Sequence, residues 1–168
     1  YSLGAIYAAD DYISRDIGKA IHYLTLSANQ NNRNAQYALG TLYFESKYNS
    51  QDINKAIHYF TLAAKQNHPF AQYWLGIISP DTDKAIHYLT LSANQNDSDA
   101  QYALGCIYYN GRKTTQDIEK SIYYFNLAAH QNHFAAQYNL GVIYSENKYV
   151  LRNINKAIYY FTLSSNLN

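Results

Sequence analysis

KAIHYLTLSANQN, at residues 19–31 and again letter for letter at residues 84–96, decides the fold. Each copy runs within a few residues into AQYALG, and the closing glycine of that motif has counterparts along the whole chain. They are Gly4, Gly40, Gly76, Gly105 and Gly141, at intervals of 36, 36, 29 and 36 residues. Self-similarity at a period of about 20 to 50 residues is typical of proteins whose units stack on one another. Residues 1–168 are therefore interpreted as a single repeat array.

Each repeat contains two helical patterns. In the first, Ala35, Leu39, Leu42 and Tyr43 are spaced i, i+4, i+7 and i+8, which predicts one buried stripe along a helix. The second begins at Asp52 and is apolar around most of its circumference, so it is predicted to be covered on two sides. Its apolar residues are Ile53, Ala56, Ile57, Tyr59, Phe60, Leu62 and Ala63.

Polar residues mark both ends of the second helices. The residues predicted to cap the first turns are Asp16, Asp52, Asp81, Asp117 and Asn153. The residues predicted to end these helices in the left-handed conformation are Asn31, Asn67, Asn96, Asn132 and Asn168. A hairpin of this size cannot bury its own apolar faces, so neighbouring hairpins must stack. The predicted fold class is all-α, a right-handed α/α superhelix (solenoid) of antiparallel helical hairpins.

The predicted repeats are unequal in length. They span residues 1–33, with a truncated first helix, then 34–69, 70–98, 99–134 and 135–168. The third is seven residues shorter than its neighbours, and the sequence leaves open whether this is a true deletion or an omitted loop. Because the chain has no Met and begins at Tyr1 inside a repeat, it is interpreted as a slice of a longer polypeptide.

Composition excludes several classes of partner. Thirteen basic and twelve acidic residues give a net charge of +1, so there is no basic field for nucleic acid or for an anionic membrane surface. No apolar run approaches the ~20 residues of a membrane-spanning helix. The single cysteine, Cys106, excludes an internal disulfide and favours a cytoplasmic over a secreted protein, although the compartment stays unknown.

Two motifs carry a family resemblance. Leu39-Gly40-x-x-Tyr43 followed by Ala56-x-x-x-Phe60-x-x-Ala63 resembles the tetratricopeptide pattern, whose period is about 34. The period of 36 and the segments AQYWLG (71–76), DINKA (52–56) and AAKQN (63–67) resemble Sel-one-like repeats more closely. Asn replaces the closing Gly of that family in every copy, and its loop Gly survives only as Gly111.

The resemblance implies a function. Sel-one-like repeat proteins act as adaptors and scaffolds, for example in endoplasmic-reticulum protein degradation, in activating wall-synthesis enzymes and in bacterial signalling. The chain is therefore expected to be a non-enzymatic scaffold that binds other proteins, such as neighbouring subunits of a large complex. Two alternatives stay open, a structural component packed into a larger assembly or filament, and the regulatory repeat region of a longer multidomain protein. RNA reading by helical repeats is disfavoured by the absence of a basic stripe.

Motifs for catalysis or cofactor binding are weak. His22, His58 and His87 occupy equivalent positions, but stacked helices lie ~8–10 Å apart and a zinc–nitrogen bond is ~2.0–2.1 Å long. They are expected to be surface or interface residues, and His130 and His133 are expected at a helix C-terminus. Ser145-x-x-Lys148 lacks the companion motifs of penicillin-recognising enzymes. No catalytic residue, metal site or cofactor is predicted.

The candidate binding residues are those that differ between copies while lying on one face of the first helices. Extended concave surfaces are what solenoids use for binding, and first helices usually line them. The predicted concave stripe consists of Asn34, Ala38, Thr41, Phe70, Trp74, Ile77, Asp99, Ala103, Cys106 and Asn139.

The third copy differs most from the others. It holds the bulky apolar set Phe70, Trp74 and Ile77, which is interpreted either as a partner anchor or, for Trp74, as filler for the space left by the shortened repeat. Ser79-Pro80 is predicted to be the N-cap and first residue of the next helix. The shortening is expected to open a notch, lined by Tyr43, Ser79, Tyr108 and Tyr109.

Overall fold

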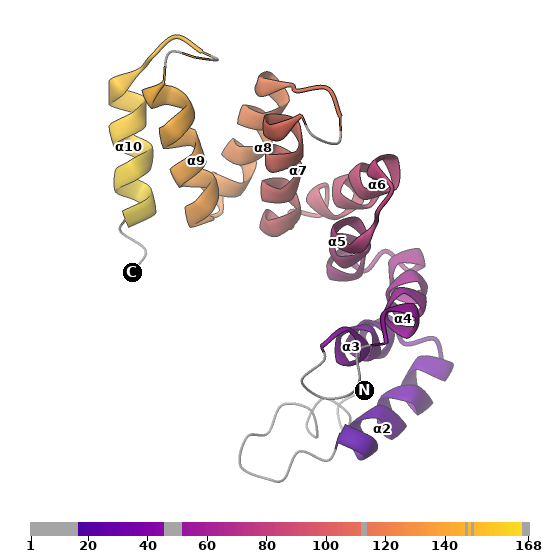
Figure 1. Ribbon diagram of the computed structural model, residues 1–168. Helices are drawn as coiled ribbons and strands as arrows, with labels where there is room; N and C mark the ends of the chain where they lie inside the picture. The colour runs from indigo at the N-terminus through magenta and orange to yellow at the C-terminus, as the bar shows by residue number, and fades with distance from the viewer. Residues whose placement is uncertain (1–16, 46–51, 112–113, 147, 149, 166–168) are drawn as a thin grey trace. The chain divides into compact units, whose positions relative to one another are not determined.

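The computed structural model describes residues 17–45, 52–111, 114–146, 148 and 150–165, and over these residues all regular secondary structure is α-helical (Figure 1). The helices are α2 (Ile17–Asn29), α3 (Arg33–Phe44), α4 (Ile53–Lys65), α5 (Pro69–Ile78), α6 (Thr82–Ala93), α7 (Ser98–Asn110), α8 (Ile118–His130), α9 (Phe134–Ser145) and α10 (Ile154–Ser165). The all-α fold class is confirmed. The predictions for Gly4, Asp16 and Asn168 fall outside the described residues.

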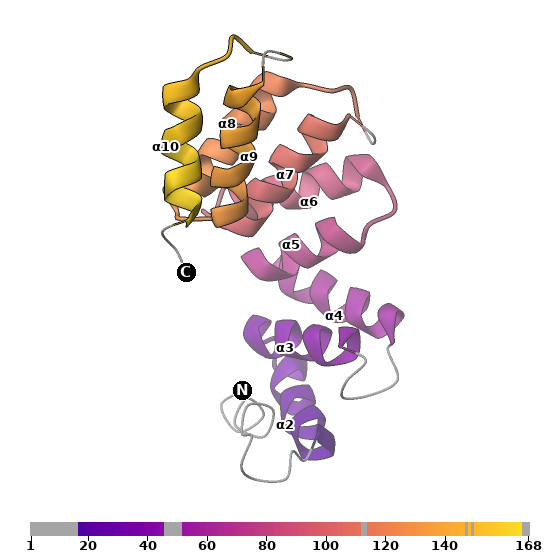
Figure 2. The same ribbon diagram turned by 60° about the vertical axis from the view of Figure 1, so that its left-hand side comes forward.

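The helices group into two compact units, one ending at Ile78 and the other beginning at Ser79. In the first unit α2 packs on α3, α3 on α4, and α4 on α5. In the second unit α6 to α10 pack in the same consecutive way, and Figure 2 shows the pair α9 and α10 side by side. Each unit is therefore built from stacked helical hairpins, the construction of solenoid proteins.

Within each unit, the first helices of successive repeats also contact one another. α3 contacts α5 in the first unit, and α7 contacts α9 in the second. The second helices of successive repeats contact each other less. The first helices therefore contact one another within each unit, and they carry the residues of the predicted binding stripe.

Helix ends follow the predicted chemistry. The side chains of Asp52, Asp81 and Asp117 each accept a hydrogen bond from the backbone amide three residues later, and Asn153 does the same for Lys156. The left-handed prediction is confirmed at Asn31, Asn67, Asn96 and Asn132, whose φ angles are 62°, 60°, 66° and 61°. The prediction for Ser79-Pro80 is wrong, because Asp81 caps α6, which begins at Thr82, while Ser79 donates to the Asp81 carbonyl.

The core of each hairpin is made of small and branched apolar side chains. In the first unit the buried cluster is Ala20, Leu24, Ala28, Ala35, Leu39 and Leu42. Phe60 is fully buried against Gly40, and Phe125 is fully buried against Gly105 in the same way. Double-sided burial of the second helices is wrong at Ile53 and Ile57 of α4, which are 37% and 38% exposed.

A clamp of two tyrosines and a lysine closes the open end of three hairpins. The Tyr43 and Tyr59 rings stack with centroids 5.7 Å apart, and the Lys55 ammonium lies 5.0 Å above the Tyr43 ring. The Asp52 amide donates to the Tyr43 carbonyl, and the Asp52 carboxylate lies 3.2 Å from the Lys55 ammonium. The equivalent stacks are Tyr108 on Tyr124 and Tyr144 on Tyr160. The tyrosines of each clamp therefore stack on each other within their own repeat.

Ser121 is a buried exception in the core. It is completely buried and its hydroxyl has no hydrogen-bond partner, whereas every other repeat has Ala at this position. A buried hydroxyl without a partner loses its hydration and gains nothing in return. Replacing Ser121→Ala is therefore expected to stabilise the protein by about 1 kcal/mol, measured by chemical denaturation. A loss of stability would show that the hydroxyl makes a favourable interaction.

Candidate interaction surface

The apolar part of the predicted stripe lies on α5. Phe70 and Ile77 are 51% and 44% exposed, although both are large apolar side chains. Trp74 lies between them and is half-buried, with its ring stacked on Phe60 at 6.3 Å and tilted against Phe44 at 4.8 Å. Trp74 thus packs against the preceding repeat, while its two neighbours on the stripe face solvent.

The remaining stripe positions of the first unit lie on α3. Asn34 is exposed near the start of the helix, and Ala38 and Thr41 are half-buried along it. The Thr41 hydroxyl donates to the carbonyl of Tyr37 one turn earlier, so it is satisfied locally. α3 contacts α5, so the two helices that carry the stripe of the first unit pack on each other.

The stripe of the second unit is more polar. Asp99 is exposed on α7, where Ala103 and Cys106 are half-buried, and Asn139 is half-buried on α9. Burial raises the pKa of the Cys106 thiol. The Asp99 carboxylate lies 3.3 Å from Nε2 of His133. The stripes of the two units therefore differ in chemistry, although both lie on first helices.

The predicted notch draws its residues from both units. Tyr43 belongs to the first unit, and Ser79, Tyr108 and Tyr109 belong to the second, so the notch stays a prediction. Within its own unit, Tyr108 stacks on Tyr124 in the clamp described above. In sequence, Ser79 occupies the clamp position of Tyr43 and Tyr108, so the third repeat lacks the tyrosine pair.

Buried glutamines were missed at the sequence level. Gln36 is 2% exposed, and its amide donates to the Ala28 carbonyl at the end of the preceding helix. It accepts in turn from the amide of Gln66 at 2.7 Å. The other buried glutamines of the first helices are Gln72, Gln101 and Gln137. Their recurrence in four copies was the available signal, since a surface Gln has no reason to recur.

Two histidines cap first helices. His68 Nδ1 accepts from the Ala71 amide at 3.4 Å and caps the start of α5, and His133 Nδ1 accepts from the Ala136 amide at 3.3 Å and caps α9. The prediction that His133 lies at a helix C-terminus is therefore wrong, while His130 does end α8. The pattern was missed because His is not among the usual capping residues.

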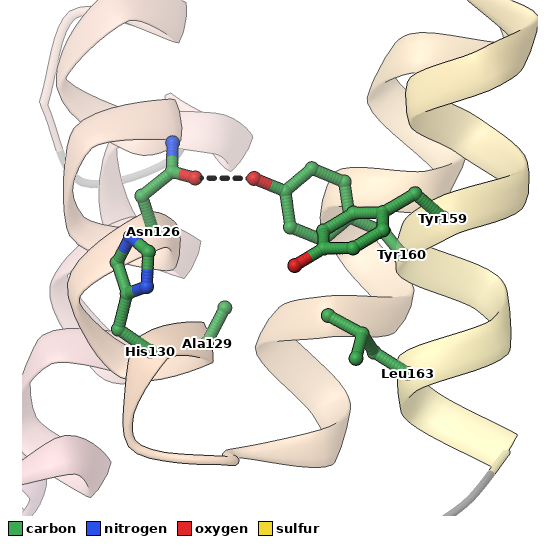
Figure 3. Close-up of a pocket in the computed structure, with 6 residues that line it drawn as sticks. All are labelled: Asn126, Ala129, His130, Tyr159, Tyr160 and Leu163. Carbon is green, nitrogen blue, oxygen red and sulfur yellow. Dashed lines mark hydrogen bonds between the residues drawn. The ribbon is translucent and has the colours of Figure 1, made fainter.

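A small pocket lies between the second helices α8 and α10. Figure 3 shows the Tyr160 hydroxyl pointing across it to Asn126, to which it donates at 2.7 Å. The lining is completed by Ala129, His130, Tyr159 and Leu163. Its space of about 30 Å³ suits one or two water molecules, since ligand sites in proteins usually measure roughly 300 Å³ or more.

The three histidines at equivalent positions of the second helices lie on the surface. His22, His58 and His87 are exposed, and each ring contacts the ring of the tyrosine that follows it edge-on, with centroids 5.1 to 5.4 Å apart.

Among the described residues, no helix is both long and apolar enough to span a lipid bilayer.

Solved structures share this fold. A Sel1 repeat protein from Oxalobacter formigenes matches at 27% identity and a TM-score of 0.88, over 99% of this chain and 71% of its own. A protective antigen of uropathogenic Escherichia coli, described as displaying an SLR fold, matches 98% of this chain at 24% identity and a TM-score of 0.87. This chain spans 37% of that antigen. An immunity protein of Pseudomonas aeruginosa matches at 16% identity and a TM-score of 0.54, over 99% of this chain and 80% of its own.

The sequence itself matches a family model along its entire length. No curated protein matches the chain. The model of the Sel1 repeat matches it five times, at residues 1–32, 33–68, 69–97, 98–133 and 134–168. The hairpins α3–α4, α7–α8 and α9–α10 each lie within one of these matches, and the match at residues 69–97 contains α5 and α6. The chain therefore belongs to the Sel1 repeat family.

Proposed function

We propose that this chain is a non-enzymatic scaffold that binds a partner protein along the stripe of its first helices. The observation that carries the proposal is the exposure of Phe70 and Ile77 on α5. Burying a large apolar side chain contributes about 1.5–3 kcal/mol, and aromatic side chains dominate the energetics of protein interfaces. Family membership supports the scaffold role, since Sel1 repeats are typical of protein interaction.

The pattern of variation between copies supports this choice of surface. Core positions repeat closely, as Leu39, Leu75, Leu104 and Leu140 do. The stripe positions change from copy to copy, as expected where the partner rather than the repeat architecture decides the side chain. The partner is therefore expected to present apolar side chains to α5, where Phe70 and Ile77 are exposed.

Capture of partner proteins tests the proposal. We expect the protein to lose its partner when Phe70→Ser and Ile77→Ser are combined, because both exposed apolar contacts disappear. The matched control is Tyr123→Ser with Tyr159→Ser, which removes two residues of 58% exposure from second helices. Each form is immobilised at equal density, and bound proteins from extracts of the source cells are quantified by mass spectrometry.

The expected result is specific to the stripe. A protein captured by the wild type and by the control should fall by at least about tenfold with the stripe variant, as about 1.4 kcal/mol of lost binding energy requires. Circular dichroism checks that the helical content of both variants is unchanged. Equal capture by all three forms would contradict the proposal.

A further inference from the structure

We infer that His68 makes the docking of α5 on α3 sensitive to acid, so that protonation of its ring loosens this junction. His68 is 7% exposed, and its ring stacks on Tyr37 of α3 with centroids 4.5 Å apart. Its Nδ1 accepts the hydrogen bond that caps α5. The imidazole of His68 therefore caps the start of α5 and packs against Tyr37 of α3.

The cap requires a neutral ring. Nδ1 accepts a hydrogen bond from the Ala71 amide only when it carries no proton of its own, so Nε2 must hold the proton of the neutral ring. Protonation turns Nδ1 into a hydrogen-bond donor that faces the Ala71 N–H, which is also a donor. It also places a positive charge at the N-terminus of α5, where the helix dipole is itself positive.

The surrounding charges oppose protonation as well. α3, α4 and α5 contain no Asp or Glu. Their titratable and charged side chains are Arg33, Tyr37 and Tyr43 on α3, Lys55, His58, Tyr59 and Lys65 on α4, and Tyr73 on α5. Burial lowers the pKa of His68, and the Arg33 guanidinium lowers it further.

The direction of the effect follows from linkage. A histidine whose pKa is lower in the folded than in the unfolded protein binds fewer protons when folded. Its contribution to stability is therefore complete above the unfolded value of about 6.5 and is lost as the pH falls through the folded value. Acid is thus expected to loosen α5 from α3, and not to tighten it.

The junction of α7 and α9 is a built-in comparison. His133 also caps a first helix and stacks on a tyrosine, with its centroid 4.5 Å from that of Tyr102. There, however, Asp99 lies 3.3 Å from its Nε2 and can pair with the protonated ring. In sequence, Ser98 and Asp99 stand where α3 has Arg33 and Asn34. The charged neighbour of His68 is therefore the positive Arg33, whereas that of His133 is the negative Asp99.

Trp74 gives a direct readout, because it is the single tryptophan of the chain and lies on α5. We expect its emission to shift to longer wavelength as the pH falls from about 7.5 to about 5. Over the same range the protection of the Ala71 amide against hydrogen exchange, corrected for the intrinsic rate, should fall about fivefold or more, as expected for a lost cap.

Variants separate this mechanism from general acid sensitivity. His68→Asn keeps a capping oxygen, as Asn32 supplies to α3, and should abolish the transition. Arg33→Gln removes the neighbouring charge and should move its midpoint to higher pH. His133→Asn should leave it unchanged. An unchanged midpoint in His68→Asn, or no transition in the wild type, would overturn the inference.

Loosening of α5 would also alter the proposed binding stripe, since Phe70 and Ile77 lie on that helix. This consequence rests on the proposed function, whereas the release of α5 does not. If the wild type loses partner capture at acid pH and His68→Asn does not, the release of α5 and the binding by the stripe are linked. If the emission shift occurs and capture is unaffected, the binding proposal is contradicted and the acid-sensitive junction stands.

Discussion

Replacing Gly40→Ala is expected to destabilise the first unit by about 2–3 kcal/mol. A β-carbon on Gly40 would lie 2.5 Å from the nearest ring carbon of Phe60, well inside van der Waals contact. Phe60 is fully buried, and its ring also stacks on Trp74, so it has little room to withdraw. The measurement is chemical denaturation followed by Trp74 fluorescence, which reports on the first unit.

A second substitution tests the reason for this loss. Phe60→Leu in the Gly40→Ala background should recover at least half of the lost stability, because it removes the ring atoms that meet the new methyl group. The first and third repeats already have Leu at this position, as Leu24 and Leu89, and both are buried. If the double variant were no more stable than Gly40→Ala, the contact with Phe60 would not be the cause.

Phe60→Ala is expected to cost about 3–5 kcal/mol, the usual range for removing a fully buried phenylalanine. The ring lies 6.0 Å from Tyr37 and 6.3 Å from Trp74, centroid to centroid, and it covers Gly40. Its loss therefore removes contacts among α3, α4 and α5 at once. The same denaturation experiment measures the loss.

Phe60→Leu alone is the matched control for this prediction. Leu fills much of the same space and is the natural residue in two of the five repeats, so a cost of about 1 kcal/mol is expected. An equal cost for Ala and Leu would indicate that the ring itself, and not the filled volume, stabilises the unit.

Much of the fold could be predicted because the copies constrain one another. A position such as Leu39 that recurs at the repeat interval is required by the architecture, and its burial follows. The left-handed residues such as Asn31 were predictable for a similar reason, since few residue types tolerate that conformation. These inferences need only local geometry and the period.

Features that depend on the packing of one hairpin against the next were harder to predict. Ile53 and Ile57 are apolar but exposed, because the apolar pattern of a helix does not show how much of its surface other helices cover. The capping role of His68 was missed because His is not among the usual capping residues. Gln36 was missed because its partner, the Ala28 carbonyl, belongs to the preceding repeat.

The candidate stripe was predicted from variation alone, and its chemistry came only with the structure. The sequence groups Phe70, Trp74 and Ile77 as one apolar set. In the structure Trp74 packs on Phe44 and Phe60, and only its two neighbours on the stripe keep large exposed surfaces. Periodicity reports which residues share a helix face, but the aromatic side chains of the neighbouring repeat decide which of them remain free.

Site-directed photocrosslinking tests the central claim, that a partner binds along the first helices, most directly. Cys106→Ser removes the only cysteine, and a new cysteine carrying a photoreactive group is then placed by Ile77→Cys on α5 or by Tyr159→Cys on α10. We predict that the captured partner is crosslinked from position 77 and not from position 159. Crosslinking from position 159 alone, or equally from both positions, would contradict the claim.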